Sequence, residues 1–432
     1  MQILALDLGT SSVKAAVLDH ATGNPAGPVA KVDYALKHPV PDAAEVEATD
    51  LWAAVDAAAK QALAGAPAPV GIGLSCLTPA LVLLDVAGEV VAPIRIHLDR
   101  RSRPVARTVQ AECGAAFLAE TGNPPLPGGI SAVSFAQLMS ERPELRGRVR
   151  HYLHANGWAA WRLTGAMAFD PGNAGFSGLF GTLTDQQWSA RWCGVFGVDR
   201  AWLPDVIDGR ATVGGLMAAA AAAWGLPAGL PVKLGVPDTS SAMLAVHLKP
   251  GDLLHVVGTT QVLGVVTPTP AAAANRLTRR LGAGPAFVAV AHNPVGGVAL
   301  DWMHHLCFRD QPEAVYYNTT VPAAAGREAV VALDPPFLGG DRHQIEPKLA
   351  AFTGLGLTDT RDDLLAAVID AMRAGHRAAL AAVGYDPAAG GTVYLTGGGA
   401  SVIRRILPEY AGAGVTMLEE GSLRGCARLF DA

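Results

Sequence analysis

The first 19 residues, MQILALDLGTSSVKAAVLD, constrain the fold more than any other part of the chain. A short apolar run leads into Asp7 and a Gly-Thr-Ser-Ser turn, after which a second apolar run begins. The pattern returns at residues 257–266, VGTTQVLGVV, where Gly258, Thr259 and Thr260 align with Gly9, Thr10 and Ser11. The sequence therefore predicts two related β-hairpins and two related halves.

Each predicted hairpin suits a phosphate group. Glycine permits backbone angles that are closed to other residues, and the amides and hydroxyls that follow can then point together at one group of oxygens. The alternative is an ordinary hairpin with a solvated tip. We predict that the phosphates are held by Gly9, Thr10, Ser11, Ser12 and Lys14 in the first hairpin and by Gly258, Thr259 and Thr260 in the second.

Asp7 adds a negative charge beside the predicted phosphate site. A carboxylate would repel bound phosphates unless a hard cation lies between them, and Mg²⁺ commonly combines one or two carboxylates with water and phosphate oxygens. Asp7 is therefore the predicted magnesium ligand. The aligned residue of the second hairpin is Val256, so we expect one such ligand.

Composition narrows the class of protein. A chain of 432 residues is long enough for two or three domains. The net charge of -5 gives no basic patch for nucleic acid, and the apolar residues 61–84 are interrupted by prolines and polar residues, so no membrane-spanning helix is expected. Five dispersed cysteines form no zinc or disulfide pattern, and the amino terminus has no signal-peptide pattern. We expect a cytoplasmic enzyme.

Hydrophobic periodicity predicts a mixed α/β chain. Strands are expected at residues 70–77, 80–91 and 392–399, and helices at residues 134–142, 156–163, 185–196, 217–224 and 361–383. A surface turn, KPGD, falls within residues 243–252, just before the second hairpin. We therefore predict an N-terminal domain at residues 1–245 and a C-terminal domain at residues 246–432.

Two further motifs indicate nucleotide chemistry. Asp238 follows an apolar strand about 20 residues before the second hairpin; it could serve as a general base, as the N-cap of a helix, or as both. Gly397, Gly398, Gly399 and Ala400 would let a nucleotide approach the backbone, although a plain strand-to-helix turn would use the same residues. Val402 stands where a GxGxxG motif requires glycine, which disfavours a dinucleotide enzyme.

Taken together, these motifs resemble the FGGY family of carbohydrate kinases over nearly the whole chain. The most specific match is residues 350–370, AAFTGLGLTDTRDDLLAAVID, followed by GVPDTSSAML, with Asp238 at the family's acid, by RLTGAMAFDPGNAG, FLGGDR at residues 337–342 and TGGGAS. The resemblance implies an α/β, two-domain actin-like, RNase H-like fold with the active site in the interdomain cleft. It also implies ATP and Mg²⁺ as cofactors, with Asp238 as the base.

The sugar-binding segments depart from the family pattern. In xylulokinase-like members a Gly-Gln-Met-His-Gly run touches the sugar, and here Thr78 and Pro79 stand in its place, the proline replacing the histidine. The resemblance gives the predicted substrate contacts as Thr78, Pro79, Asp99, Asp238 and Thr239. For Asp99, a salt bridge with Arg100 or Arg103 is the competing interpretation.

The sequence thus predicts an ATP-dependent kinase that phosphorylates a terminal hydroxyl of a small sugar, a ketose such as xylulose or ribulose. The alternatives are a polyol kinase of the glycerol type and a nucleotide- or sugar-binding regulator that has lost activity. The expected partner is the sugar or polyol, without nucleic acid or membrane, and a homodimer is left open.

Overall fold

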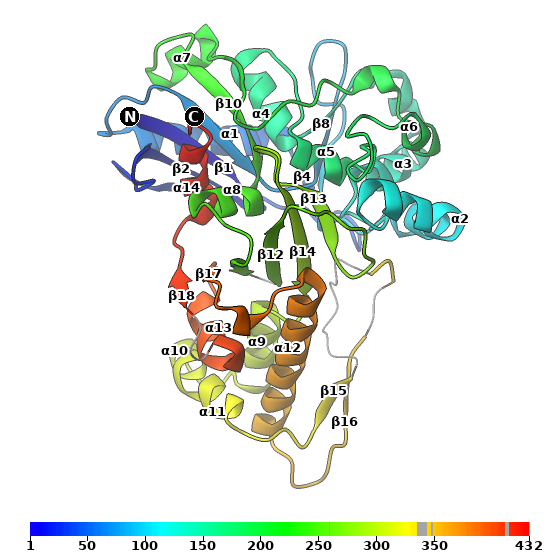
Figure 1. Ribbon diagram of the computed structural model, residues 1–432, viewed down its shortest axis with the longest axis vertical. Coiled ribbons are helices and arrows are strands. Elements are labelled where there is room, and N and C mark those ends of the chain that lie inside the picture. Colours follow the sequence, from blue (N-terminus) through cyan, green and yellow to red (C-terminus); the bar gives the residue numbers. More distant parts are fainter. Residues whose placement is uncertain (259, 335–343, 347–348, 411–413, 432) are drawn as a thin grey trace. The chain divides into compact units, whose positions relative to one another are not determined.

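The computed structural model describes residues 1–258, 260–334, 344–346, 349–410 and 414–431. The chain divides into two compact units. Unit 1 comprises Met1–His247, Thr267–Val288 and Gly421–Ala432, and unit 2 comprises Leu248–Val266 and Ala289–Glu420. The last residues of the chain therefore belong with its first half (Figure 1).

Unit 1 is built on a sheet with the strand order β3-β2-β1-β5-β10-β9. Its central strands β1, β5 and β10 are parallel and consist mostly of buried aliphatic residues, as expected for strands covered on both faces. The red α14 lies beside the blue β1 and β2 in Figure 1. These elements are β1 (Gln2–Leu8), β2 (Ser12–Asp19), β3 (Ala30–Asp33), α1 (Ala48–Leu63), β5 (Ile72–Cys76), β9 (Thr212–Gly215), α7 (Ala218–Trp224), β10 (Pro231–Pro237), α8 (Asp238–Ala245) and α14 (Gly421–Arg428).

A smaller sheet in the same unit has the order β4-β7-β6-β8 and packs with several helices. Tyr152 of this sheet and three aromatic residues of the helices are among the largest fully buried side chains of the described residues; the three are Trp158, Phe117 and Phe135. The elements are β4 (Glu45–Val46), β6 (Ala80–Leu84), β7 (Ile94–Ile96), α2 (Arg103–Thr121), α3 (Ser131–Glu141), β8 (His151–His154), α4 (Ala155–Thr164), α5 (Pro171–Ser177) and α6 (Ala190–Phe196); β13 (Leu277–Arg280) also falls in unit 1.

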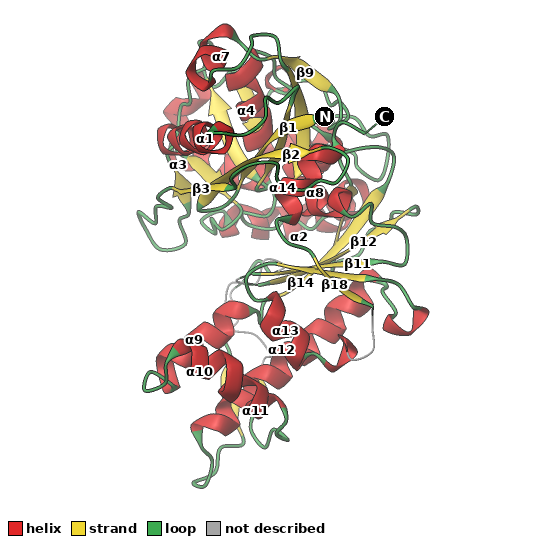
Figure 2. Ribbon diagram, turned by 90° about the vertical axis from the view of Figure 1, so that its left-hand side faces the viewer, coloured by secondary structure: helices red, strands yellow, loops and turns green. Residues whose placement is uncertain are grey.

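Unit 2 contains strands in the order β14-β12-β11-β17-β18, with helices α9, α12 and α13 on one face (Figure 2). Its core joins Leu253 and Leu395 of the sheet to Leu365 and Ile369 of α12. The elements are β11 (Leu253–Val257), β12 (Gln261–Thr267), β14 (Phe287–Asn293), α9 (Gly297–Cys307), α10 (Glu313–Val315), α11 (Val321–Ala325), the pair β15 (Ala332–Asp334) and β16 (Ala351–Thr353), α12 (Arg361–Val383), β17 (Val393–Thr396), α13 (Ala400–Ile406) and β18 (Val415–Met417).

The two units repeat one strand order. In unit 1 an antiparallel hairpin, β1-β2, extends through parallel pairing to β5 and β10. In unit 2 the hairpin β11-β12 extends in the same way to β17 and β18. The prediction of two related hairpins is confirmed, and the repeat extends beyond them to the neighbouring parallel strands.

Helix positions were predicted well where the apolar repeat was long. The predicted helix at residues 361–383 coincides with α12, which begins at a capping box formed by Thr360 and Asp363. The helix predicted at residues 185–196 covers only Ala190–Phe196, because Gln186 adopts a left-handed φ of 56° in the turn before it. The strand predicted at residues 80–91 ends at Leu84, where a turn between Asp85 and Glu89 begins.

Cysteine pairing and membrane-spanning helices are the next two features. All five cysteines are free. Within the described ranges, no helix combines the length and apolar character needed to cross a membrane.

Candidate active site

The carboxyl ends of β1, β5 and β10 meet at one edge of the unit 1 sheet. Asp7 lies opposite Ser75 in the β1-β5 register, and Cys76 lies opposite Pro237 in the β5-β10 register. Asp238 follows β10 directly, and Thr78 lies two residues beyond the end of β5. Ligands of open α/β sheets commonly bind at this edge. Three of the predicted site residues, from distant parts of the sequence, are thereby brought to one edge within one unit.

Asp7 is a nearly buried carboxylate with two serine partners. Ser75 Oγ donates to Asp7 Oδ1 over 2.8 Å, and Ser422 Oγ donates to Oδ2 over 2.6 Å. Burial raises the pKa of Asp7 to about 6, and the negative charge of Asp238 acts in the same direction, against the two serines and Lys14. Because the two carboxylates repel each other, a cation between them would be stabilised.

The first hairpin closes as a tight turn. Gly9 donates its backbone N–H to Ser12 O over 2.9 Å, and Tyr34 holds the turn by donating its hydroxyl to Gly9 O and its backbone N–H to Ser11 O. A Cβ on Gly9 would lie 2.9 Å from Ser12 O, so glycine is required for this closure. The tip stays accessible, since Ser11 is exposed and Thr10 is partly exposed.

Asp238 is the first residue of α8 and follows β10 without an intervening loop. Its Oδ1 accepts hydrogen bonds from the backbone N–H of Thr239 over 2.6 Å and from the Thr239 hydroxyl over 3.1 Å. The N-cap position of α8 belongs to Pro237, so the carboxylate stands one residue inside the helix start. Asp238 is partly exposed, as a group that exchanges protons with a substrate must be.

Helix α14 completes the site from the end of the chain. Ser241 Oγ of α8 donates to Ser422 O over 2.6 Å, and the Ser422 side chain in turn binds Asp7. Gly425 permits this approach, because a Cβ there would lie only 1.8 Å from Ser241 O. Ser422 and Gly425 thus lie in unit 1, against Asp7 and α8.

Arg279 is a buried cation that the sequence reasoning did not select. Only 1% of its surface is exposed, its Nη1 donates to Ser240 Oγ over 2.5 Å, and its guanidinium lies 5.0 Å from the centre of the Phe176 ring. Burial lowers the pKa of Arg279 to about 10, while the charges of Asp238 and Asp170 oppose that shift. Arg279 therefore carries a positive charge beside Asp238 at neutral pH.

In unit 2 the second hairpin packs against the triple glycine. Gly399 donates its backbone N–H to Val257 O over 3.2 Å, and Gly297 donates to Gly258 O over 3.1 Å. A Cβ on Gly397, whose φ is 99°, would lie 2.2 Å from Val257 O. Hairpin, glycine loop and the start of α9 thus form one closely packed group.

A cavity of about 440 Å³ opens beside this group. Its lining includes Gly258, Gly398, Gly399, Asp301, Tyr317 and Ser401. Tyr317 donates its hydroxyl to Asp301, and Arg405 Nη2 donates to Tyr317 O over 3.3 Å. An aromatic ring, polar side chains and glycines that leave the backbone accessible suit a nucleoside.

The comparisons with known proteins agree with the geometry. The model of the FGGY family of carbohydrate kinases, N-terminal domain, matches residues 2–245, more than half of the chain. The chain belongs to the FGGY family of carbohydrate kinases. The predicted family and the enzyme class, a phosphotransferase that acts on an alcohol group, are thereby confirmed.

Individual relatives of this FGGY kinase are distant but span most of its length. A xylulose kinase from Streptomyces rubiginosus is 28% identical over 415 residues, which cover 92% of this chain and 80% of the relative. An L-xylulose/3-keto-L-gulonate kinase from Escherichia coli is 26% identical over 392 residues, with coverages of 86% and 75%. The crystal structure of xylulose kinase from Rhodospirillum rubrum has a TM-score of 0.85 at 24% identity and covers 99% of this chain and 88% of that one. The predicted two-domain actin-like fold is confirmed.

Asp99 of this FGGY kinase has the surroundings of a structural residue. Its side chain is fully buried, Oδ2 accepts from the backbone N–H of Ala44 over 3.1 Å, and Arg101 Nε and Nη2 reach the same oxygen over 3.0 and 2.5 Å. Arg101 also pairs with Glu45. The salt bridge anticipated with Arg100 or Arg103 is formed by Arg101 instead. This burial argues against a contact between Asp99 and a sugar.

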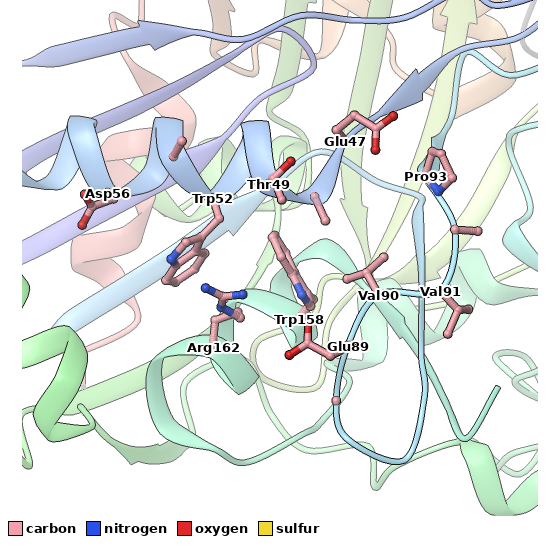
Figure 3. Close-up of a pocket in the computed structure, with 14 residues that line it drawn as sticks. Glu47, Thr49, Trp52, Asp56, Glu89, Val90, Val91, Pro93, Trp158 and Arg162 are labelled. Atoms are coloured by element: carbon pink, nitrogen blue, oxygen red, sulfur yellow. The ribbon is translucent and has the colours of Figure 1, made fainter. Parts of the chain in front are cut away.

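Another cavity of this FGGY kinase contains none of the predicted site residues. It measures about 630 Å³ and lies between α1 and α4, where Arg162 stacks 4.6 Å from the centre of the Trp52 ring, near Trp158 (Figure 3). Glu47, Glu89 and Asp56 also line it. Among the predicted site residues, Thr259 lies outside the described part of the chain, as does the FLGGDR segment at residues 337–342.

The magnesium site at Asp7 stays a prediction. No group of three or more His, Cys, Asp or Glu side chains that could hold a metal ion occurs among the residues that the structure describes. Mg²⁺ that is bound partly by phosphate and water needs no such cluster. Asp7, with a carboxylate on the ligand-binding edge, is the residue whose donor chemistry fits.

Sequence reasoning missed the side chains that support the site. Ser75 and Ser422 hold Asp7, and Arg279 lies beside Asp238. One signal for Ser75 was available, since it is the polar residue of an otherwise apolar strand next to the expected β1. The contact of Ser422 with Asp7 and the place of Arg279 beside Asp238 join segments that are remote in sequence, and no local pattern predicts them.

Proposed function

We propose that this FGGY kinase transfers the γ-phosphoryl group of ATP to a terminal hydroxyl of a small ketose. The choice of a ketose is supported by two relatives whose names specify xylulose or L-xylulose and 3-keto-L-gulonate. We also expect it to act in the cytoplasm. The observation that carries the proposal is the pair of carboxylates, Asp7 and Asp238, at the carboxyl ends of β1 and β10, two parallel strands that flank β5 in unit 1.

In this proposal Asp238 is the general base. The oxygen of the substrate hydroxyl attacks the γ-phosphorus, the bond from that phosphorus to the β,γ-bridging oxygen breaks, and ADP leaves. Asp238 takes the proton from the attacking hydroxyl and later passes it to water. Such bases contribute roughly a hundred- to ten-thousand-fold in rate. Arg279 places a positive charge beside this carboxylate.

Asp7 would hold Mg²⁺, either directly or through a water molecule. When bound, Mg²⁺ neutralises the charge of the phosphate oxygens and so favours phosphoryl transfer. Asp7 Oδ1 and Oδ2 each accept a hydrogen bond from one serine hydroxyl. Each oxygen keeps a further lone pair that could bind the cation or a water molecule on it. Ser75 and Ser422 thus fix the orientation of Asp7 without exhausting its capacity.

Unit 2 supplies the proposed nucleotide site. Backbone groups of Gly258 and Gly398 would approach the phosphates and ribose, while Asp301 and Tyr317 line the cavity in which the adenine would lie. Ala400 begins α13 directly after the glycines, so the start of that helix faces the same group of residues. Thr260 and Gly258 close the hairpin turn through a backbone hydrogen bond of 3.0 Å.

The test is ADP release in a coupled assay with Mg-ATP and a panel of ketoses, aldoses and polyols. We expect one ketose to stimulate ADP release many-fold and Asp238→Asn to reduce kcat by roughly a hundredfold or more. Asp362→Asn is the matched control, since Asp362 also lies in the first turn of a helix, in unit 2. A rate near that of the wild type for Asp238→Asn would exclude the base. ATP binding without stimulation by any compound would favour a regulator.

A further inference from the structure

A chain of buried polar side chains leads inward from Thr78. Thr78 Oγ1 donates to Asn173 Oδ1 over 2.7 Å, and His154 Nδ1 reaches the same oxygen over 3.1 Å. On the other side of the amide, Asn173 Nδ2 donates to Asp170 Oδ2 over 2.6 Å. Asn173, His154 and Asp170 are fully buried, whereas Thr78 is partly exposed.

Asp170 determines which way the Asn173 amide faces. The carboxylate accepts from four N–H groups: the backbone of Gly172 and Asn173 and the side chains of Asn156 and Asn173. Burial raises the pKa of Asp170 to about 6, so at neutral pH it is ionised and can only accept. The NH₂ group of Asn173 must therefore face Asp170, which turns its oxygen toward Thr78.

His154 enforces the same direction from the opposite side. Burial lowers the pKa of His154 to about 4, so the ring is neutral and carries one proton. That proton must be on Nδ1, because Asn173 Oδ1 can only accept. Nε2 then accepts from Ser131 Oγ over 2.7 Å, and Ser131 Oγ accepts from the Tyr152 hydroxyl over 2.6 Å. The donor and the acceptor of every hydrogen bond among these side chains are thereby fixed.

This arrangement determines which hydrogen bonds Thr78 can make to a ligand. Its single hydroxyl proton is used by Asn173, so only lone pairs of Oγ1 are available to a ligand. Thr78 stands at the sheet edge that carries Asp238, because Cys76 pairs with Pro237 and a Cβ on Gly172 would lie 3.1 Å from Pro237 Cδ. Thr78, with its buried polar partners, and the proposed base Asp238 thus lie at the paired ends of β5 and β10.

We propose that Thr78 is a specificity-determining residue that acts only as a hydrogen-bond acceptor toward the substrate, with Asp170, Asn173 and His154 as its positioning residues. It selects a hydroxyl group at one position of the sugar and rejects a carbonyl oxygen, carboxylate or fluorine there, because these groups cannot donate. The inference rests on the proposed function for the identity of the ligand as a sugar, and it concerns binding rather than phosphoryl transfer.

The test is calorimetric binding of the sugar panel without ATP, followed by deoxy and deoxyfluoro analogues of each sugar that binds. For the wild type we expect a position, other than the hydroxyl that faces Asp238, at which fluorine weakens binding by about tenfold or more, as much as removal of the hydroxyl does. Thr78→Val should weaken the parent sugar by a similar factor and remove the penalty at that position alone. Thr78→Ser should bind the parent sugar within about threefold of the wild type, and Thr108→Val, on the exposed face of α2, should match the wild type.

The outcomes separate this inference from the proposed kinase. Wild-type affinity in Thr78→Val, or fluorine tolerated at every position other than the hydroxyl that faces Asp238, would overturn the acceptor role even if the enzyme phosphorylates the sugar. Binding that depends on Thr78 without ADP formation would refute the kinase and leave the inference standing. If no compound binds, both fail. The wild-type analogue series decides the point even if Thr78→Val does not fold.

Discussion

Arg279 Nη1 donates a hydrogen bond of 2.5 Å to Ser240 Oγ, two residues beyond Asp238 in the first turn of α8. A guanidinium that is fully buried and stacked on Phe176 therefore fixes the part of the helix that presents the proposed base. The positive charge of Arg279 and the negative charge of Asp238 also attract each other, and burial of the guanidinium strengthens this attraction.

Replacement of Arg279 should affect turnover of the sugar more than binding of ATP. We expect Arg279→Gln to lower kcat/KM for the sugar by about tenfold or more, because it removes the positive charge beside Asp238. The KM for ATP should change little. Steady-state kinetics against both substrates measures this, with Arg280→Gln as the control, since Arg280 is partly exposed and bonds to Gln186 and Gly284. Equal effects of the two variants would contradict the role of Arg279.

Asp7→Asn should stabilise the protein while impairing catalysis. Burial raises the pKa of Asp7 in the folded state to about 6, above its ordinary value of 3.8. The folded state therefore binds the carboxyl proton of Asp7 more tightly than the unfolded state does. The stability that this proton contributes is fully present below pH 3.8 and is lost as the pH rises to about 6. At pH 7.5 the variant should be more stable by up to about 3 kcal/mol, but near pH 3.5 this difference should vanish.

Urea unfolding at the two pH values, without magnesium, measures the effect of Asp7→Asn. Activity with Mg-ATP should fall sharply in the same variant. Ser422→Ala provides the contrast, because it removes a partner of Asp7 and keeps the charge, and should lower stability. An Asp7→Asn variant that is less stable than the wild type at pH 7.5 would show that the buried charge does not have the cost we assign to it.

Two neighbouring glycines should respond differently to substitution. Gly398 lines the unit 2 cavity, and a Cβ on this residue would meet open space. Gly398→Val should therefore raise the KM for ATP by about tenfold and leave the melting temperature unchanged. Gly397→Ala should instead destabilise the protein by on the order of 1–3 kcal/mol, because φ is 99° and Val257 O blocks the Cβ. Calorimetry and ATP titration separate the two effects, and an unchanged KM for ATP in a stably folded Gly398→Val would argue against a nucleotide in this cavity.

A buried histidine pair should make unit 2 sensitive to acid. His255 and His376 stack at 5.1 Å and are fully buried, and burial lowers the pKa of His376 to about 4. As the pH falls from 6.5 to 4, the unfolded chain takes up a proton at His376 that the folded chain does not, so about 3 kcal/mol of stability is lost. His376→Gln should flatten the dependence of unfolding free energy on pH over this range. An unchanged slope would contradict this assignment.

The sequence was informative where a site depends on local geometry. The hairpin around Gly9, the glycines at 397–399 and the acid at 238 are each recognisable from a few neighbouring residues, and their strand contexts were predicted correctly. Burial could not be predicted in this way. Asp99 looked like a ligand because its type and motif suit a sugar, yet contacts with Ala44 and Arg101 remove it from solvent. Arg279 was not selected from the sequence, although it is buried beside Asp238.

The proton arrangement around Thr78 shows the same limit. RLTGAMAFDPGNAG was recognised as a family segment, but the role of Asp170 and Asn173 depends on His154 and Asn156, which approach from β8 and α4. Hydrogen-bond direction is a property of the whole network. A linear motif records two members and says nothing of the donors that orient them.

The bond between Ser422 and Asp7 joins residues 415 positions apart. During translation, the carboxylate at position 7 is made 415 residues before the serine that orients it. A chain still on the ribosome therefore carries the hairpin around Gly9 without the helix that completes it. The order of synthesis itself thus delays the maturation of the site until the segment that carries Ser422 is available to fold.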